Sequence, residues 1–171
     1  MALLTDAQVA DELAIRDLTQ RFTDAVNRSA TAEMAALFAP DGRWEVPGVT
    51  DTVGHDAIAA RLAGLLAQFS LLVQLLHSGV VMLDGDRATA RWYLTEHARD
   101  ADGGGALFIG YYDDDLVRQD GVWRFASRRF AFLYRGRDDL PGRSYPYAGR
   151  DAVAPASAGP AASTAPGGPG A

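Results

Sequence analysis

The sequence contains no cysteine. This absence excludes disulfide bonds, thiolate chemistry and cysteine-based zinc or iron–sulfur sites. Any catalytic group must therefore come from histidine, carboxylate, tyrosine or arginine side chains. The basic side chains are all arginine and form no cluster, and the formal net charge is -6. Because nucleic acids and anionic membranes are bound by concentrated positive charge, we expect neither as a partner.

Long hydrophobic runs are also missing. The longest apolar stretch, from Leu62 to Leu76, is interrupted by Gln68, Ser70 and Gln74 and is too short to cross a bilayer. The N-terminal residues carry acidic side chains where a secretory signal peptide carries basic ones. We therefore expect a cytoplasmic protein.

The composition changes sharply near the C-terminus. The chain has 171 residues, of which 48% are hydrophobic, and this is enough for one domain with its own core. From Ala148 onward almost every residue is alanine, proline, glycine or serine. Such a segment cannot bury enough apolar surface to offset the entropy of ordering it. We predict one domain over residues 1–147 and a disordered tail over residues 148–171.

The first part of the domain has helical patterns. Thr5 and Gln8 have the spacing of a capping box, which predicts a first helix that ends near Asn27. A short second helix is expected over residues 32–38, and an apolar stripe predicts a third helix after Gly54.

The second part of the domain has a sequence pattern typical of β-strands. Aromatic and β-branched runs alternate with turn signals, and they predict four strands at about 75–83, 87–98, 105–118 and 121–134. A short strand over residues 41–46 precedes them. Since tight turns join the four strands, neighbours should be antiparallel. The expected fold class is α+β, with three N-terminal helices packed on a curved, mostly antiparallel sheet that leaves a cavity.

Three segments resemble the SnoaL-like, or nuclear transport factor 2-like, superfamily and occur in its order. They are IRDLTQRFTDAVNRSATAEMAALFAPDGRWEV from Ile15, LLHSG around His77, and GYYDDDLVRQDGVWRFASRRF from Gly110. The resemblance covers residues 10–135 and implies a cone-shaped fold. Its members include scytalone and bile-acid dehydratases, hexachlorocyclohexane dehydrochlorinase and polyketide cyclases, and also proteins that only bind ligands.

This resemblance implies two classes of function. The first is a cofactor-independent lyase or cyclase, of the dehydratase or isomerase type, acting on a small hydrophobic polyketide- or terpenoid-like metabolite. Such an enzyme belongs to secondary metabolism, for example antibiotic biosynthesis. The second is a non-catalytic module of the same fold that binds a small molecule or serves in assembly. We expect a homodimer or homotrimer in either case.

His77 is the leading candidate for a general base, because imidazole exchanges protons near neutral pH and the rest of its strand is apolar. A hydrogen-bonded histidine without a chemical role is the alternative. The resemblance implies a partner at the end of the first helix, where the dehydratases carry an aspartate and this chain carries Asn27. An asparagine can orient the imidazole but adds no charge to stabilise its protonated form. A helix cap is an equally open role for Asn27.

Alternation along the last two strands gives two further catalytic candidates. It places Phe108 and Tyr112 on one face of their strand, and Arg128, Phe130 and Phe132 on one face of the next. Tyr112 could donate a hydrogen bond to a substrate oxygen, or it could be an ordinary core tyrosine. The resemblance implies that Arg128 stabilises negative charge in the pocket. Its alternative is a surface ion pair with the nearby aspartates.

The remaining candidates line the predicted pocket. His97 shares strand parity with Tyr93 and resembles a second pocket histidine of scytalone dehydratase, although the nearby turn favours exposure. Because His77 and His97 lack the short spacing of metal ligands, we predict no metal, and we expect no cofactor. The residues expected to contact the substrate are Phe22, Trp44, Tyr93, His97, Phe108, Phe130 and Phe132.

Overall fold

The structure, a computed structural model, describes residues 3–137 and 143–144. The predicted tail over residues 148–171 lies outside the described residues. The elements in chain order are α1 (Asp6–Asn27), α2 (Thr31–Ala36), β1 (Phe38–Val46), β2 (Thr50–Val53), α3 (His55–Leu66), β3 (Phe69–Asp84), β4 (Arg87–Asp100), β5 (Gly105–Gln119), β6 (Val122–Gly136) and β7 (Arg143–Ser144).

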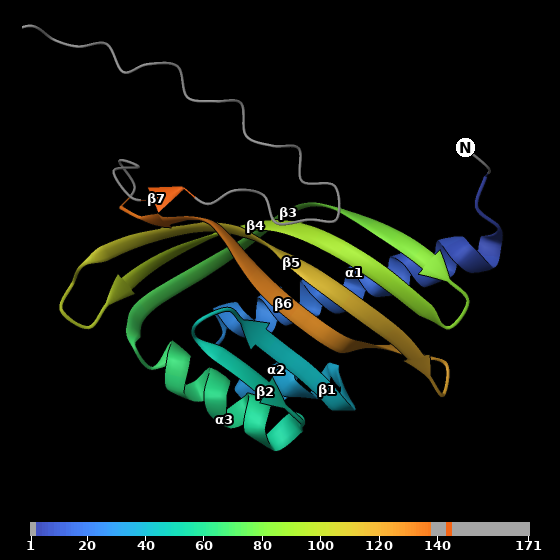
Figure 1. The fold of residues 1–171 in the computed structure, drawn as a ribbon, viewed down its shortest axis with the longest axis horizontal. Coiled ribbons are helices and arrows are strands. Elements are labelled where there is room, and N and C mark those ends of the chain that lie inside the picture. The colour runs from blue at the N-terminus through green and yellow to red at the C-terminus, as the bar shows by residue number, and fades with distance from the viewer. Residues whose placement is uncertain (1–2, 138–142, 145–171) are drawn as a thin grey trace, which may run out of the picture.

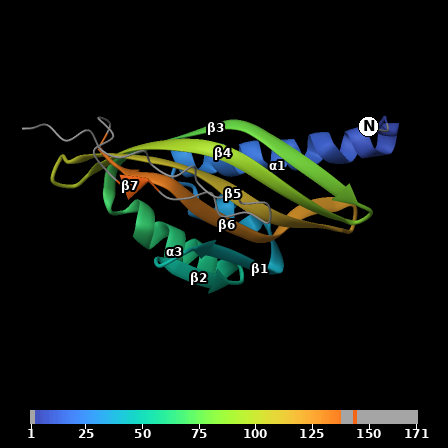
Figure 2. The same ribbon diagram turned by 45° about the horizontal axis from the view of Figure 1, so that its top comes forward.

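One curved sheet and three helices form the fold. The strand order is β2-β1-β6-β5-β4-β3, and β7 pairs with β6. Every pairing is antiparallel except that of β1 with β6. Figures 1 and 2 show the sheet curving over the helices, which lie on its concave side. The predicted α+β cone is confirmed. No helix in the described part of the chain is long and apolar enough to cross a membrane.

The elements differ from the predicted ones mainly at their ends. β1 begins at Phe38, so that Pro40 lies inside a strand, and the pairing of β1 with β6 shifts register between Phe38 and Arg43. Proline lacks the backbone donor that a regular ladder needs, and this accounts for an irregularity there. β2 was not predicted, because four residues of mixed polarity carry too little pattern. β3 begins at Phe69, six residues before the predicted strand.

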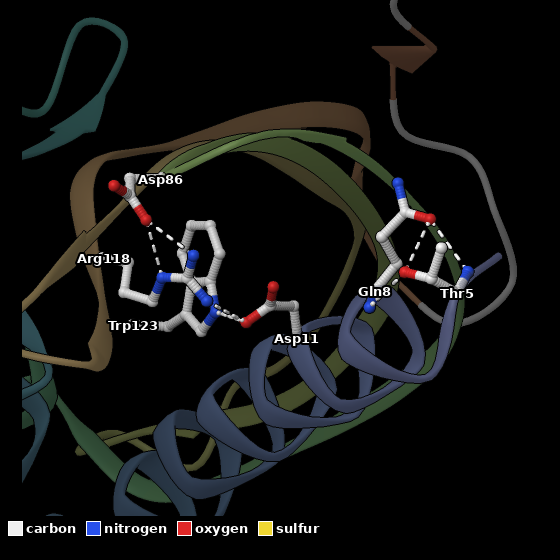
Figure 3. Close-up of polar contacts among 6 residues, drawn as sticks. All are labelled: Thr5, Gln8, Asp11, Asp86, Arg118 and Trp123. Atoms are coloured by element: carbon white, nitrogen blue, oxygen red, sulfur yellow. Dashed lines mark hydrogen bonds and ion pairs between the residues drawn. The ribbon is translucent and has the colours of Figure 1, made fainter.

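Side-chain hydrogen bonds connect the first turns of α1 to strands β5 and β6. The Thr5 hydroxyl accepts a bond from the Gln8 backbone N–H, and the Gln8 side chain accepts one from the Thr5 N–H, which confirms the capping box. One turn later, Asp11 Oδ1 accepts bonds from Arg118 at 2.7 Å and from the Trp123 indole at 2.9 Å. Figure 3 shows the two donors reaching this carboxylate from the same side, with Asp86 on the other side of Arg118.

Replacing Asp11 with alanine should destabilise the protein by about 1 to 3 kcal/mol, because the buried Trp123 indole loses its acceptor. Chemical denaturation of the variant measures this loss. The matched control is Asp17→Ala, which breaks an exposed pair with Arg21 on the same helix and should change little. Equal stability of the Asp11 variant and the wild type would contradict the anchoring role.

Candidate functional site

A cavity of about 180 Å³ lies between the helices and the concave face of the sheet. Its walls are mostly aromatic and aliphatic. Phe22, Trp44, Phe108, Phe130 and Phe132, which were expected to contact the substrate, all line this cavity. The other lining residues are Val26, Met34, Val46, Val49, Leu62, Leu65, Leu66, Gln68, Phe69, Leu72, Gln74, Glu96, Tyr112 and Arg135.

The polar part of this wall is built around the buried amide of Gln74. Its Nε2 donates to Glu96 Oε1 at 2.8 Å and to the Tyr112 hydroxyl oxygen at 2.9 Å. Its Oε1 accepts a bond from the Thr23 hydroxyl at 3.0 Å. Since both amide hydrogens are used, Gln74 holds a carboxylate oxygen and a phenol oxygen next to the same nitrogen. The hydrogen of the Tyr112 hydroxyl then remains available to a ligand.

Burial shifts the pKa values of Glu96 and Tyr112 in the same direction. Burial raises the pKa of the Glu96 carboxyl above its ordinary value, against the opposing effect of the Gln74 hydrogen bond. Burial also raises the pKa of Tyr112, and the nearby Glu96 charge adds to the shift. A carboxylate with a raised pKa is a stronger base than an exposed one, and the phenol stays protonated as a donor. The pair has the groups needed for proton transfer.

Asn27 fixes the strand on which Gln74 lies. Its Nδ2 donates to the Gln74 backbone carbonyl at 3.0 Å, and its Oδ1 accepts from the Gln74 backbone N–H at 2.7 Å. One amide therefore satisfies a donor and an acceptor of β3 at once. The prediction that Asn27 orients His77 is wrong, because the Asn27 side chain is committed to the β3 backbone.

His77 lies on the opposite face of β3 from the cavity. Its side chain is exposed, and its Nε2 is 2.8 Å from the Thr95 hydroxyl on the outer face of β4. The alternation of β3 turns Leu72 and Gln74 inward, so a residue three positions after Gln74 points outward. The predicted role of His77 as pocket base is therefore wrong. The sequence pattern could not show which face of β3 points to the cavity, because leucine and valine occur on both faces of this strand.

Asn27→Asp should weaken the protein by about 1 to 2 kcal/mol at neutral pH, because a carboxylate cannot donate to the Gln74 carbonyl and repels it. Only the protonated form of the introduced carboxyl could donate to that carbonyl and restore the bond. The stability of the variant should therefore fall relative to wild type as pH rises and this carboxyl loses its proton. The measurement is the difference in unfolding free energy from wild type at pH values of about 4.5 and 7.5, on either side of that titration. A difference that grows at low pH would contradict this arrangement.

Arg128 is fully buried but does not line the cavity. Its guanidinium lies 3.8 Å from the ring centroid of Phe125 and 4.2 Å from that of Tyr112. It forms a two-pronged ion pair with Asp114, at 2.9 and 2.7 Å. The expected aromatic surroundings are confirmed, whereas a direct role in the pocket and a surface ion pair are both wrong. Its exposed neighbour Arg129 lies 3.6 Å from Glu45 instead.

Tyr93 and His97 were also expected in the pocket, and both lie on the outer face of β4. Tyr93 packs 6.1 Å from Tyr111, measured between ring centroids, and His97 is exposed. The residues of β4 that face inward are instead Trp92, Leu94, Glu96 and Ala98. Sequence analysis missed Glu96. Its signal was a single carboxylate among the apolar residues that share its face of β4.

The comparisons with known proteins agree with this fold. Residues 7–129 match the model of the SnoaL-like domain. An uncharacterized protein of Mycobacterium bovis is 28% identical over 130 residues, which are 74% of this chain and 88% of that protein.

Two solved structures show the same fold. A scytalone dehydratase-like protein of Novosphingobium aromaticivorans is 20% identical with a TM-score of 0.72, over 82% of this chain and 96% of that one. A hexachlorocyclohexane dehydrochlorinase, LinA-type3 of Novosphingobium barchaimii, is 17% identical with a TM-score of 0.72, over 81% of this chain and 95% of that one. At these identities the likeness concerns the fold.

Proposed function

Since the chain belongs to the SnoaL-like domain family, we propose that it is a cofactor-independent lyase-type enzyme that removes a proton next to a carbonyl group. The observation that carries this proposal is the Gln74 amide, which holds the Glu96 carboxylate and the Tyr112 hydroxyl together inside an apolar cavity. The names dehydratase and dehydrochlorinase of the two structural neighbours denote eliminations, and elimination can begin with such a proton transfer.

The proposed mechanism assigns one task to each polar group. The Glu96 carboxylate takes the proton from the carbon next to the carbonyl, and the electron pair of that C–H bond forms the enolate. The Tyr112 O–H donates a hydrogen bond to the enolate oxygen. Loss of a leaving group from the β-carbon then completes an elimination, and in a β,γ-unsaturated ketone return of the proton at the γ-carbon completes an isomerisation. Gln74 is a positioning residue, because it acts through the two oxygens that it holds.

The cavity indicates the size and character of the substrate. An apolar cavity of about 150 Å³ is known to hold one benzene ring, and this cavity measures about 180 Å³. We therefore propose a substrate with one ring or a body of monoterpene size, within the polyketide- or terpenoid-like class. Its carbonyl end lies at Tyr112 and its apolar body contacts the phenylalanine-rich walls.

Incorporation of solvent deuterium tests this function without knowledge of the natural leaving group. The protein is incubated in deuterium oxide with a set of small aryl and cyclic ketones, and deuterium next to the carbonyl is measured by mass spectrometry. We expect exchange well above that of buffer with at least one ketone that binds. Ketones that bind in the cavity and exchange no faster than in buffer would overturn the proposal.

A ligand-binding module is the second candidate function. The observation in its favour is Gln74, an amide that cannot titrate and that occupies the inward position of the strand on which a histidine base was expected. In this case Glu96 and Tyr112 would serve only as acceptor and donor for a ligand. The same deuterium experiment separates the candidates, because a binding module retains affinity and shows no exchange.

A further inference from the structure

The rim of the cavity carries a cation that the proposed proton transfer does not use. Arg135 lies near the end of β6, lines the cavity and is exposed. It is paired in register with Phe108 on β5, which directs both side chains to the same face. Figures 1 and 2 show this end of β6 on the same side of the molecule as the start of β3, where Gln68 and Phe69 also line the cavity.

The Arg135 guanidinium is held by aromatic rings. It lies 5.7 Å from the ring centroid of Phe108 and 5.9 Å from that of Phe132, and both rings line the cavity. Within residues 3–137 and 143–144, no carboxylate is paired with it. Stacking leaves the planar N–H edge of a guanidinium available for a carboxylate in the two-pronged geometry that arginine favours.

From this cation at the rim of an apolar cavity we infer that the pocket takes a small apolar carboxylic acid, bound as its anion. Arg135 holds the carboxylate at the rim, and the carbonyl oxygen inside accepts from Tyr112 as in the proposed mechanism. The inference rests on the proposed function, since it names the class of substrate for the same cavity. The acid group lies away from the reacting carbon and fixes which end of the molecule enters first.

The experiment compares 3-benzoylpropanoate, an aryl ketone with a carboxylate, with its neutral methyl ester. Calorimetry on the full chain should give a dissociation constant about tenfold lower for the acid than for the ester. A hydrogen bond to a charged group contributes about a factor of ten in affinity. Arg135→Gln should abolish this preference and Arg135→Lys should keep part of it. Arg99→Gln, an exposed arginine on the outer face of β4, is the matched control and should bind like wild type.

The results separate this inference from the proposed function. Equal affinity of wild type for acid and ester, or an unchanged preference in Arg135→Gln, would overturn the anion site even if deuterium exchange occurs. Preferential binding of the acid without exchange would uphold the site and overturn the enzymatic proposal. An acid preference that weakens from about 0.05 to about 0.5 M salt, while ester affinity stays constant, would further support an ionic contact.

Discussion

Replacing Arg128 with methionine is expected to lower the free energy of unfolding by about 3 to 5 kcal/mol. The guanidinium is fully buried, and its loss leaves the Asp114 carboxylate in the core without its two-pronged partner. Burial already raises the pKa of Asp114 although Arg128 opposes the shift. Without Arg128 the carboxyl must either take up a proton or remain charged in an apolar environment. Urea denaturation at neutral pH measures the loss.

Two further variants make the Arg128 prediction specific. The double variant Asp114→Leu/Arg128→Met removes both charges, and it should recover most of the lost stability because no unpaired ion remains. Arg129→Met changes the adjacent arginine, whose partner Glu45 is partly exposed, and should alter stability little. If Arg128→Met loses less than about 1 kcal/mol, or the double variant is no better, the buried pair is not the cause.

Glu96→Gln should lower the rate of deuterium exchange by about 10² to 10⁴, the usual cost of losing a general base. The glutamine oxygen can still accept from the Gln74 amide, so the pocket and its affinity for ketones should persist. The matched control is His77→Gln, which changes an exposed group on the outer face and should exchange at the wild-type rate. Normal exchange in Glu96→Gln with a loss in His77→Gln would reverse the assignment.

The pH dependence gives an independent test of Glu96. As a base it must be deprotonated, so the wild-type exchange rate should rise with pH through a pKa above the ordinary glutamate value of 4.5. The same raised pKa means that the folded protein binds this proton more tightly than the unfolded chain. Its stabilising contribution is present below the unfolded pKa and is lost as pH rises through the folded pKa. Glu96→Gln should therefore gain stability relative to wild type as pH increases over that range.

Local patterns in the sequence determined the elements of this protein. The capping box at Thr5 and Gln8, the helical stripe after Gly54 and the turn signals between the last four strands all act over a few residues. Such signals require no knowledge of distant neighbours. They predicted three helices and the antiparallel hairpins, and most of the aromatic pocket followed from strand alternation. The parallel pairing of β1 with β6 joins segments far apart in the chain, and only the tertiary structure shows it.

The identity of the polar site was decided by the tertiary structure. β3 is apolar on both parities, so the sequence could not tell that Gln74 faces the cavity and His77 faces away. The role of the Asn27 amide is seen only in the tertiary structure, where it pairs with the backbone carbonyl and N–H of Gln74 on β3. Arg128 has aromatic neighbours in the sequence pattern, yet its partner Asp114 is determined by the pairing of β5 with β6. The face that a strand buries and the partner of each charged residue depend on contacts between distant segments. The pattern along one strand does not encode these contacts.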